Sequence, residues 1–319
     1  MISTSIVFSP DASIDRNPSD VIIAAGDAVL FYVREARILP SSTNGFNSHL
    51  PVAPPVTQKT SESESVIHLP ESSAVINIML HCVYGLPCTH ITPTVKDIQA
   101  TFAAMKTYGL PYQSYAESGA PLHHTIRTLI PTSPLDVYAL AASMDNRDLA
   151  TIASSHLLSS PLSNMSEEMS IKIGPVYLRR LFFLHLGRAQ ALKRLLIIPP
   201  DLHQPTNACT VTMQVAIFRR WALAAVQLAW DDSPNISPSL IESTFSPIGD
   251  DITCNLCKES LLRRISEVVR RWGQVKVFNL LLLCITIFHN RLFKKGYNIS
   301  KNKMNLFCTT ILPQLETSW

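Results

Sequence analysis

Apolar and polar positions near the start of the chain follow the pattern of a β-hairpin. Residues 19–38 read SDVIIAAGDAVLFYVREARI, in which the apolar runs VIIAA and VLFYV are separated by a break containing Gly26 and Asp27. Short β-branched and aromatic runs on either side of a glycine-containing break predict two antiparallel strands. A hairpin alone is only marginally stable in water, so later elements are expected to cover its apolar faces. Residues 1–16 carry no such pattern and are expected to form a flexible N-terminus.

The next segment combines a loop, a short strand and two helices. Residues 49–65 are rich in Pro, Ser and Thr, which predicts a surface loop, and VIHL at 66–69 predicts a brief strand. Apolar side chains then recur at helical spacing over residues 75–83. A second helix is predicted to begin at Thr94, because its spacing to Asp97 matches a capping box.

From residue 131 to 278 the periodicity is helical throughout, without a strand pattern. Ser-Pro at the start of residues 133–158 introduces a predicted helical hairpin. A long helix is predicted between Gly174-Pro175 and Pro199-Pro200, and apolar stripes mark two more helices at 213–228 and 261–272. The sequence therefore predicts an α+β front and an all-α rear.

The order of the front elements resembles a BTB/POZ domain, and it is closest to the type found in basidiomycete fungi. The segments that carry the resemblance are, in order, DVIIAAGDAVLFYVREARIL, NGF, VIHLPE, SSAVINIMLHCVYG and VKDIQATFAAMKTYGL. The later SPLDVYALAASMDNRDLATIAS is similar to the helical hairpin that follows the domain in those fungal proteins. The resemblance covers residues 17–160 well and 161–278 more loosely. It implies a BTB/POZ-like domain at 17–130, in which helices cover a small sheet, and a helical region at 131–278.

The resemblance also implies a function and an interface. BTB/POZ domains are protein-interaction modules that commonly form homodimers, and some of them bridge cullin ligases to substrates or act in transcriptional regulators. By this resemblance Asp20, Arg34 and Arg37 are candidate residues of a dimer or partner interface. Glu35 departs from the family, which often has a basic residue there. An ion pair of Asp20 with Arg34 or Arg37 could replace the family's charged pocket; the alternative is that these residues are ordinary surface charges. The predicted function is a self-associating scaffold or adaptor, with a cullin-ligase substrate adaptor and a transcriptional regulator as alternatives.

Motifs of catalysis are absent from the sequence. It contains no phosphate loop, dinucleotide glycines, nucleophile elbow or paired-histidine zinc-protease pattern. The acidic pairs Asp231-Asp232 and Asp250-Asp251 lie beside Pro, Ser and Gly, as expected of solvated loops, and His123-His124 has no carboxylate or thiol nearby in sequence. We therefore expect no catalytic residues and a protein that is not an enzyme.

One group of residues has the chemistry of a metal site. Cys254 and Cys257 have the two-residue gap that lets two thiolates bind one zinc ion, and His203 and Cys209 could supply the other two ligands. The alternatives are a disulfide or redox pair, and buried thiols that act as small apolar side chains. We expect no cofactor, and zinc is the one candidate that the residues offer. A bound ion would staple the helical region, with no open coordination position and hence no catalysis.

The charge and the cysteine content of the chain indicate the class of protein and its cellular compartment. A hydrophobic content of 46% and a net charge of +3 are typical of a globular chain that does not bind nucleic acid. The arginine doublets, such as Arg263-Arg264, are expected on the solvated faces of amphipathic helices. Seven cysteines in a chain that starts without a secretory signal predict reduced thiols in the cytoplasm or the nucleus.

Residues 279–319 form an atypical tail. An uninterrupted apolar run at 280–288 is followed by five basic residues against Glu316 alone. The run is shorter than the roughly 20 apolar residues that a membrane helix needs, so a membrane span is not expected. The other interpretations are a helix that closes the rear core, and a stretch of translated intron that is not native to this architecture.

Overall fold

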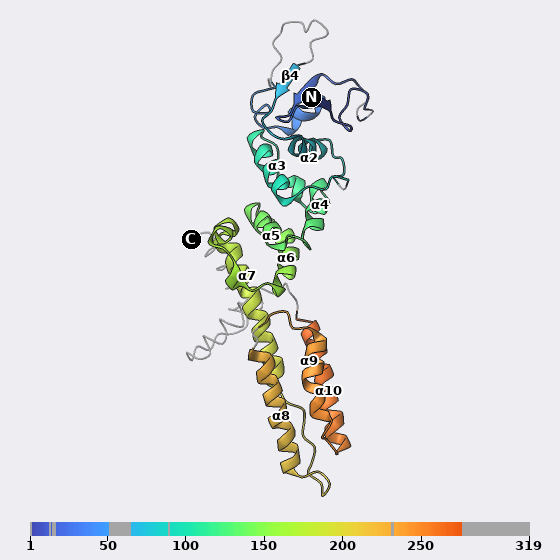
Figure 1. Cartoon of the computed structure of the whole chain (residues 1–319), viewed down its shortest axis with the longest axis vertical. Helices are drawn as coiled ribbons and strands as arrows, with labels where there is room; N and C mark the ends of the chain where they lie inside the picture. The colour runs from blue at the N-terminus through green and yellow to red at the C-terminus, as the bar shows by residue number, and fades with distance from the viewer. Residues whose placement is uncertain are drawn as a thin grey trace, which may run out of the picture. The chain divides into compact units, whose positions relative to one another are not determined.

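The chain divides into two compact units in the computed structural model (Figure 1). The N-terminal unit is Met1–Leu181 and the C-terminal unit is Phe182–Trp319. The structure describes residues 2–12, 14, 17–50, 65–88, 90–230 and 233–275. The predicted tail at 279–319, the acidic pair Asp231-Asp232 and most of the predicted loop at 49–65 lie outside these ranges.

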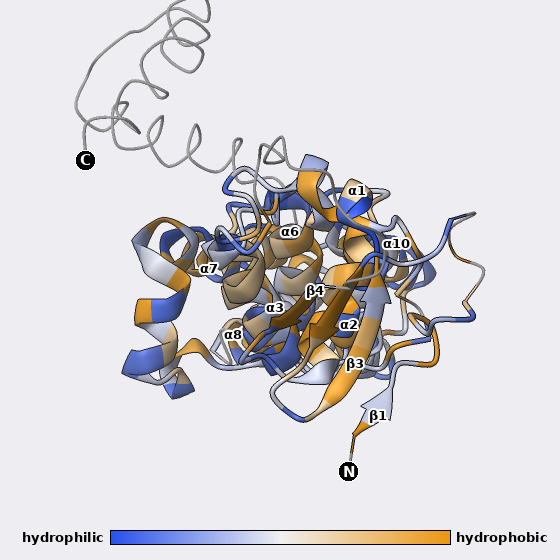
Figure 2. Ribbon diagram, turned by 90° about the horizontal axis from the view of Figure 1, so that it is seen from above, coloured by the Kyte–Doolittle hydropathy of each residue, from blue (hydrophilic) through white to orange (hydrophobic). Residues whose placement is uncertain are grey.

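A mixed four-stranded sheet opens the N-terminal unit. Its strands are β1 (Ser3–Thr4), β2 (Val21–Ala24), β3 (Val29–Val33) and β4 (Ser65–His68), in the order β1-β3-β2-β4. β2 and β3 pair antiparallel, while β1 and β4 pair parallel to β3 and β2 respectively. Every residue of the central strand β2 is buried, and Figure 2 shows β3 as a largely hydrophobic strand. The predicted hairpin, the predicted third strand and the α+β class are thus confirmed.

The first residues of the chain differ from the expected flexible N-terminus at 1–16. β1 pairs with β3, and the Phe8 side chain is only 1% exposed. Its ring lies edge-on to the rings of His81 and Tyr84, with both centroid distances 5.3 Å, and its carbonyl accepts a hydrogen bond from the Tyr32 N–H. The physical reason is that β3 would otherwise present an unpaired edge and an uncovered apolar face.

The hairpin turn is fastened to the start of α2 (Ser73–Val83). The Gly26 N–H donates to the Glu71 carbonyl at 2.9 Å. The Asp27 carboxylate accepts hydrogen bonds from the Ser73 N–H, at 3.0 and 3.1 Å, and from the Ser73 hydroxyl at 2.7 Å. These bonds lower the pKa of Asp27, chiefly through the Ser73 hydroxyl. The carboxylate caps the helix and holds it beneath the hairpin.

Replacing Gly26 by alanine is expected to destabilise the N-terminal unit by about 2 kcal/mol, because overpacking at a rigid site costs roughly 1–3 kcal/mol. A Cβ at this position would lie 2.6 Å from the Pro70 carbonyl oxygen, which is main chain and cannot rotate away. Thermal unfolding followed by far-UV circular dichroism measures the effect. Gly273→Ala is the matched control, because a Cβ there meets nothing within 4 Å. An unchanged unfolding midpoint for Gly26→Ala would contradict the close approach.

Besides α2 and the first part of α7, the described residues of the N-terminal unit contain five α-helices. They are α1 (Glu35–Ile38), α3 (Val95–Thr107), α4 (Pro121–Leu129), α5 (Pro134–Ser143) and α6 (Arg147–His156). The predicted capping box is confirmed: the Thr94 hydroxyl accepts from the Asp97 N–H, and the Asp97 side chain accepts from the Thr94 N–H. In Figure 1, α2 lies directly beneath the sheet, with α3 beside it and α4 below it. α4 was not predicted, although Pro121 at its first turn is a helix-start signal.

α5 and α6 form the predicted helical hairpin and pack within the N-terminal unit, so the division between units falls later than the predicted boundary at residue 130.

A buried histidine joins α4 to α6. The imidazole of His123 in α4 lies 3.1 Å from the Asp148 carboxylate of α6. His123→Ala is expected to cost about 1–2 kcal/mol, because it leaves a gap and unpairs the carboxylate. Far-UV thermal unfolding against His124→Ala, whose side chain is exposed, tests this; equal midpoints would contradict it.

The C-terminal unit is helical over its described residues. It contains the second part of α7 (Glu167–Leu196), followed by α8 (Val211–Trp230), α9 (Pro238–Phe245) and α10 (Asn255–Gly273). The helix conformation of α7 is broken at Gly174, whose φ is 75°, at the place where a helix start was predicted. α9 was not predicted, although Ser237 caps it by accepting from the Leu240 N–H. The core of the unit consists of Leu192, Leu196, Trp221, Leu228, Ile236, Ile241, Phe245, Ile248, Leu261, Ile265, Val268 and Trp272.

Two buried arginines tie α7 and α10 together reciprocally. Arg264 of α10 donates to the carbonyls of Leu195, at 2.7 Å, and Ile198, at 3.0 Å, where α7 ends. Arg188 of α7 donates to the Val275 carbonyl at 2.7 Å, just beyond the end of α10, and lies 4.4 Å from the centroid of the Trp272 ring. Each guanidinium therefore satisfies carbonyls at the negative end of the other helix. This corrects the prediction for Arg264, which is 7% exposed and not on a solvated face.

Candidate metal centre

The four side chains predicted as metal ligands meet at one point of the C-terminal unit. His203 and Cys209 lie on the segment between α7 and α8, and Cys254 and Cys257 lie at the start of α10. Their imidazole nitrogen and three sulfurs all lie within 4.8 Å of one another. A three-thiol, one-imidazole set of this kind could bind a metal such as zinc.

The spacings are close to the edges of a zinc tetrahedron. The sulfurs of Cys209 and Cys257 are 3.6 Å apart, and the His203 Nε2 lies 3.3 Å from the Cys254 sulfur and 3.2 Å from the Cys257 sulfur. Zinc bonds of about 2.3 Å to sulfur and about 2.05 Å to nitrogen give tetrahedral edges of about 3.8 Å and about 3.6 Å. Small outward shifts of these side chains would therefore accommodate the ion.

The loop before α8 orients its two ligands through the main chain. Thr206 and Cys209 exchange N–H to carbonyl hydrogen bonds, both 3.0 Å, which fold the segment into a tight turn. The Nδ1 of His203 lies 2.7 Å from the Gln204 carbonyl oxygen. Since a carbonyl can only accept, the proton is on Nδ1 and the lone pair on Nε2 faces the thiols. This is the tautomer that a metal requires.

The other two thiols occupy the first turn of α10 and differ in acidity. Cys254 is the N-cap residue, and the Cys257 N–H lowers the pKa of its thiol to about 7. Burial, together with the neighbouring Cys209 and Cys254 thiols, raises the pKa of the Cys257 thiol to about 12. The free amides and the positive end of the helix favour negative charge at this position. A bound cation would deprotonate all the coordinating thiols.

A glutamine that the sequence reasoning missed supports the cluster. Gln214 of α8 is only 2% exposed, and its Nε2 donates to the Cys209 sulfur at 3.7 Å. The same nitrogen lies 3.5 Å from the Nε2 of His203. A buried amide directed at a thiolate is the kind of outer contact that orients metal ligands. The sequence signal that could have identified Gln214 is its position five residues after Cys209, one helical turn into α8.

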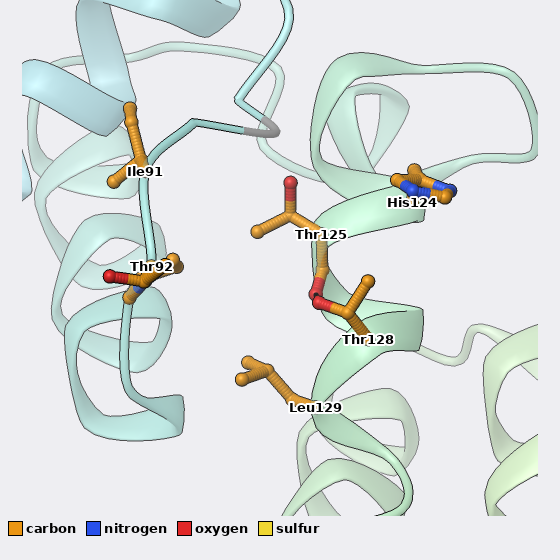
Figure 3. Close-up of a pocket in the computed structure, with 7 residues that line it drawn as sticks. Ile91, Thr92, His124, Thr125, Thr128 and Leu129 are labelled. Atoms are coloured by element: carbon orange, nitrogen blue, oxygen red, sulfur yellow. Dashed lines mark hydrogen bonds between the residues drawn. The ribbon is translucent and has the colours of Figure 1, made fainter.

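The described residues line two cavities, one beside the metal centre and one beside α4, and their side chains differ in chemistry. A cavity of about 160 Å³ borders the metal centre and is lined by its three cysteines, among others. Arg220 and Asp251, both predicted to be solvated, also line it and form an ion pair at 2.5 Å. The second cavity, of about 180 Å³, lies between residues 91–93 and α4 (Figure 3). Its single imidazole, that of His124, points away from Ile91, so no acid–base pair converges among the lining residues.

The predicted interface residues gather near the start of α1. The Asp20 carboxylate accepts a hydrogen bond from the Glu35 N–H at 2.7 Å. The Arg34 N–H donates to the Tyr84 hydroxyl at 2.9 Å, and the Arg37 guanidinium lies 5.9 Å from the centroid of the Tyr84 ring. The Asp20 carboxylate thus holds the start of α1 through a main-chain contact.

Comparison of the chain with protein-family models, with curated proteins and with solved structures gives no match. Among the residues that the structure describes, no helix is long and apolar enough to cross a membrane. The fold and the site therefore define an α+β chain with a helical C-terminal unit and a candidate metal centre of four ligands.

Proposed function

We propose that the C-terminal unit holds one zinc ion as a structural centre, bound by His203, Cys209, Cys254 and Cys257. The observation that carries the proposal is the convergence of four potential zinc ligands from two segments about 50 residues apart in the sequence. Four protein ligands fill a tetrahedron, so no position is left for a water or a substrate. When bound, zinc cross-links the loop before α8 to the start of α10.

Metal content of the purified full-length chain tests this proposal. One zinc per chain is expected for the wild-type protein, and Cys257→Ser is expected to lose it. Cys88→Ser is the matched control, because Cys88 is also a buried free thiol but lies in the N-terminal unit, away from the cluster. Wild-type protein without zinc, or a Cys257→Ser variant that retains it, would contradict the proposal.

We also propose that the chain is a non-enzymatic interaction protein that self-associates through its N-terminal unit. The proposal is supported by the order of β2, β3, β4, α2 and α3, which is the order of the segments that resemble a BTB/POZ domain. A further support is the cluster of Asp20, Arg34 and Arg37, a charged group at the exposed start of α1. The adaptor for a cullin ligase is the narrower form of this proposal.

Sedimentation of the full-length chain tests self-association. A homodimer at micromolar concentration is expected, and Arg37→Glu is expected to weaken it at least tenfold (about 1.4 kcal/mol) through reversed charge at the interface. The control is Arg263→Glu in the C-terminal unit, which exposes a similar charge change elsewhere. A monomer for the wild-type chain would overturn the proposal. Binding of a cullin N-terminal domain to the dimer would distinguish an adaptor from a plain scaffold.

A further inference from the structure

We propose that Cys254 and Cys257 also form a peroxide-reactive thiol pair, whose oxidation to a disulfide releases the metal. This inference rests on the proposed zinc centre and adds regulation to it. Its chemical partner is a small hydroperoxide such as hydrogen peroxide. The pair is chosen from the three thiols of the cluster on two grounds, access and spacing.

Access favours Cys254 as the first thiol to react. The side chains of Cys209 and Cys257 are only 2% and 4% exposed, whereas Cys254 is partly exposed. All three line the 160 Å³ cavity beside the centre, which is large enough to admit a molecule the size of hydrogen peroxide. Cys254 is thus the thiol that solvent reaches, and the other two lie behind it.

Spacing favours Cys257 as the second thiol. Cys254 is the N-cap of α10 and Cys257 lies three residues on, in the first turn, with the two sulfurs within 4.8 Å. Two thiols at the start of one helix, one partly exposed and one buried, have the arrangement of reactive dithiol motifs. Cys209 is also near, with its sulfur 3.6 Å from that of Cys257, but it belongs to a separate segment that the metal holds in place.

The reaction balances without any other oxidant. The Cys254 sulfur attacks one peroxide oxygen, the O–O bond breaks, and a sulfenic acid forms as hydroxide leaves. The Cys257 sulfur then attacks the sulfenic sulfur, the S–O bond breaks, and a second hydroxide leaves. The two sulfurs are oxidised by two electrons in total and the peroxide is reduced to two hydroxides, which take protons from solvent. With two ligands lost, His203 and Cys209 alone hold the metal weakly.

The consequence for the structure is local. Without the ion, the segment from Asp201 to Cys209 keeps its turn through Thr206 and the hydrogen bond that its Asp201 carbonyl accepts from the Ser260 hydroxyl. It loses its direct bond to the start of α10. Oxidation would therefore free the loop before α8 while the apolar core and the two buried arginines stay in place.

The test treats the zinc-loaded full-length chain with hydrogen peroxide and follows zinc with a colorimetric chelator. Release of one zinc per chain is expected, together with a disulfide between Cys254 and Cys257 in peptide maps of unreduced protein. A thiol reductant followed by zinc is expected to restore the loaded state. Zinc that stays bound until sulfinic acids appear, or a disulfide that involves Cys209, would overturn the inference.

Two matched variants separate this inference from the zinc proposal. Cys254→His and Cys209→His each keep four ligands, but only Cys254→His removes the reactive thiol. Cys254→His is expected to bind zinc and to release it to peroxide about tenfold more slowly than wild type, whereas Cys209→His should release it at the wild-type rate. Equal rates for the two variants would overturn the inference. Should either variant fail to bind zinc, the peptide map of the wild type still decides. Wild-type protein that never binds zinc defeats the proposed function itself, which is a different outcome.

Discussion

Removing zinc from the loaded chain is expected to lower the unfolding free energy of the C-terminal unit by about 4 kcal/mol, when free zinc in the reference sample is about 1,000 times the dissociation constant. Binding to the folded state alone is the source of this stabilisation, because the four ligands lie on segments that separate on unfolding. The apolar core of the unit, which includes Trp221 and Leu261, remains after chelation. We therefore expect a weakened unit and not a fully unfolded one.

Tryptophan fluorescence during urea unfolding measures this loss, since the described tryptophans, Trp221, Trp230 and Trp272, all lie in the C-terminal unit. The midpoint should fall on addition of a chelator and recover with zinc. Cys257→Ser should show the low midpoint with or without zinc, whereas Cys88→Ser should respond as the wild type does. A midpoint that does not change with zinc would show that the cluster holds no stabilising ion.

Arg264→Ala is expected to destabilise the same unit by about 3 kcal/mol, which is typical for loss of a buried charged donor that leaves acceptors unsatisfied. The Arg264 side chain holds the carbonyls of Leu195 and Ile198 and also pairs with Glu267 at 2.6 Å. Its removal therefore leaves these two carbonyls without the guanidinium donor and opens a gap beside the core. Fluorescence-monitored urea unfolding gives the change in free energy.

The neighbouring arginine supplies the control for this experiment. Arg263 is exposed, so Arg263→Ala is expected to change stability by no more than about 0.5 kcal/mol. Arg264→Lys should fall between the two, because an ammonium cannot reach both carbonyls with the fixed fork of a guanidinium. Equal stabilities of Arg263→Ala and Arg264→Ala would contradict the reciprocal tie between α7 and α10.

Local sequence patterns predicted the elements whose signals are strong. The hairpin was readable from two apolar runs around Gly26, and α3 from the spacing of Thr94 and Asp97. α4 and α9 were missed because they have only 9 and 8 residues, too few turns for a convincing apolar stripe. β1 was missed for a similar reason: two residues carry no periodicity, and its pairing depends on the exposed edge of β3.

The candidate site shows where prediction from one sequence ends. Residue type and the short gap between Cys254 and Cys257 predicted the ligands, but no local pattern sets the distance from them to His203 and Cys209. That distance depends on how α7, α8 and α10 pack. The burial of Arg264 was mispredicted for the same reason, since the carbonyls that it satisfies lie more than 60 residues away in sequence.

X-ray absorption at the zinc edge of the purified full-length chain tests the central claim most directly. We predict three sulfur ligands at about 2.3 Å and one nitrogen ligand at about 2.05 Å, with one zinc per chain. A protein that holds no zinc, or a metal surrounded by oxygen and nitrogen alone, would contradict the claim.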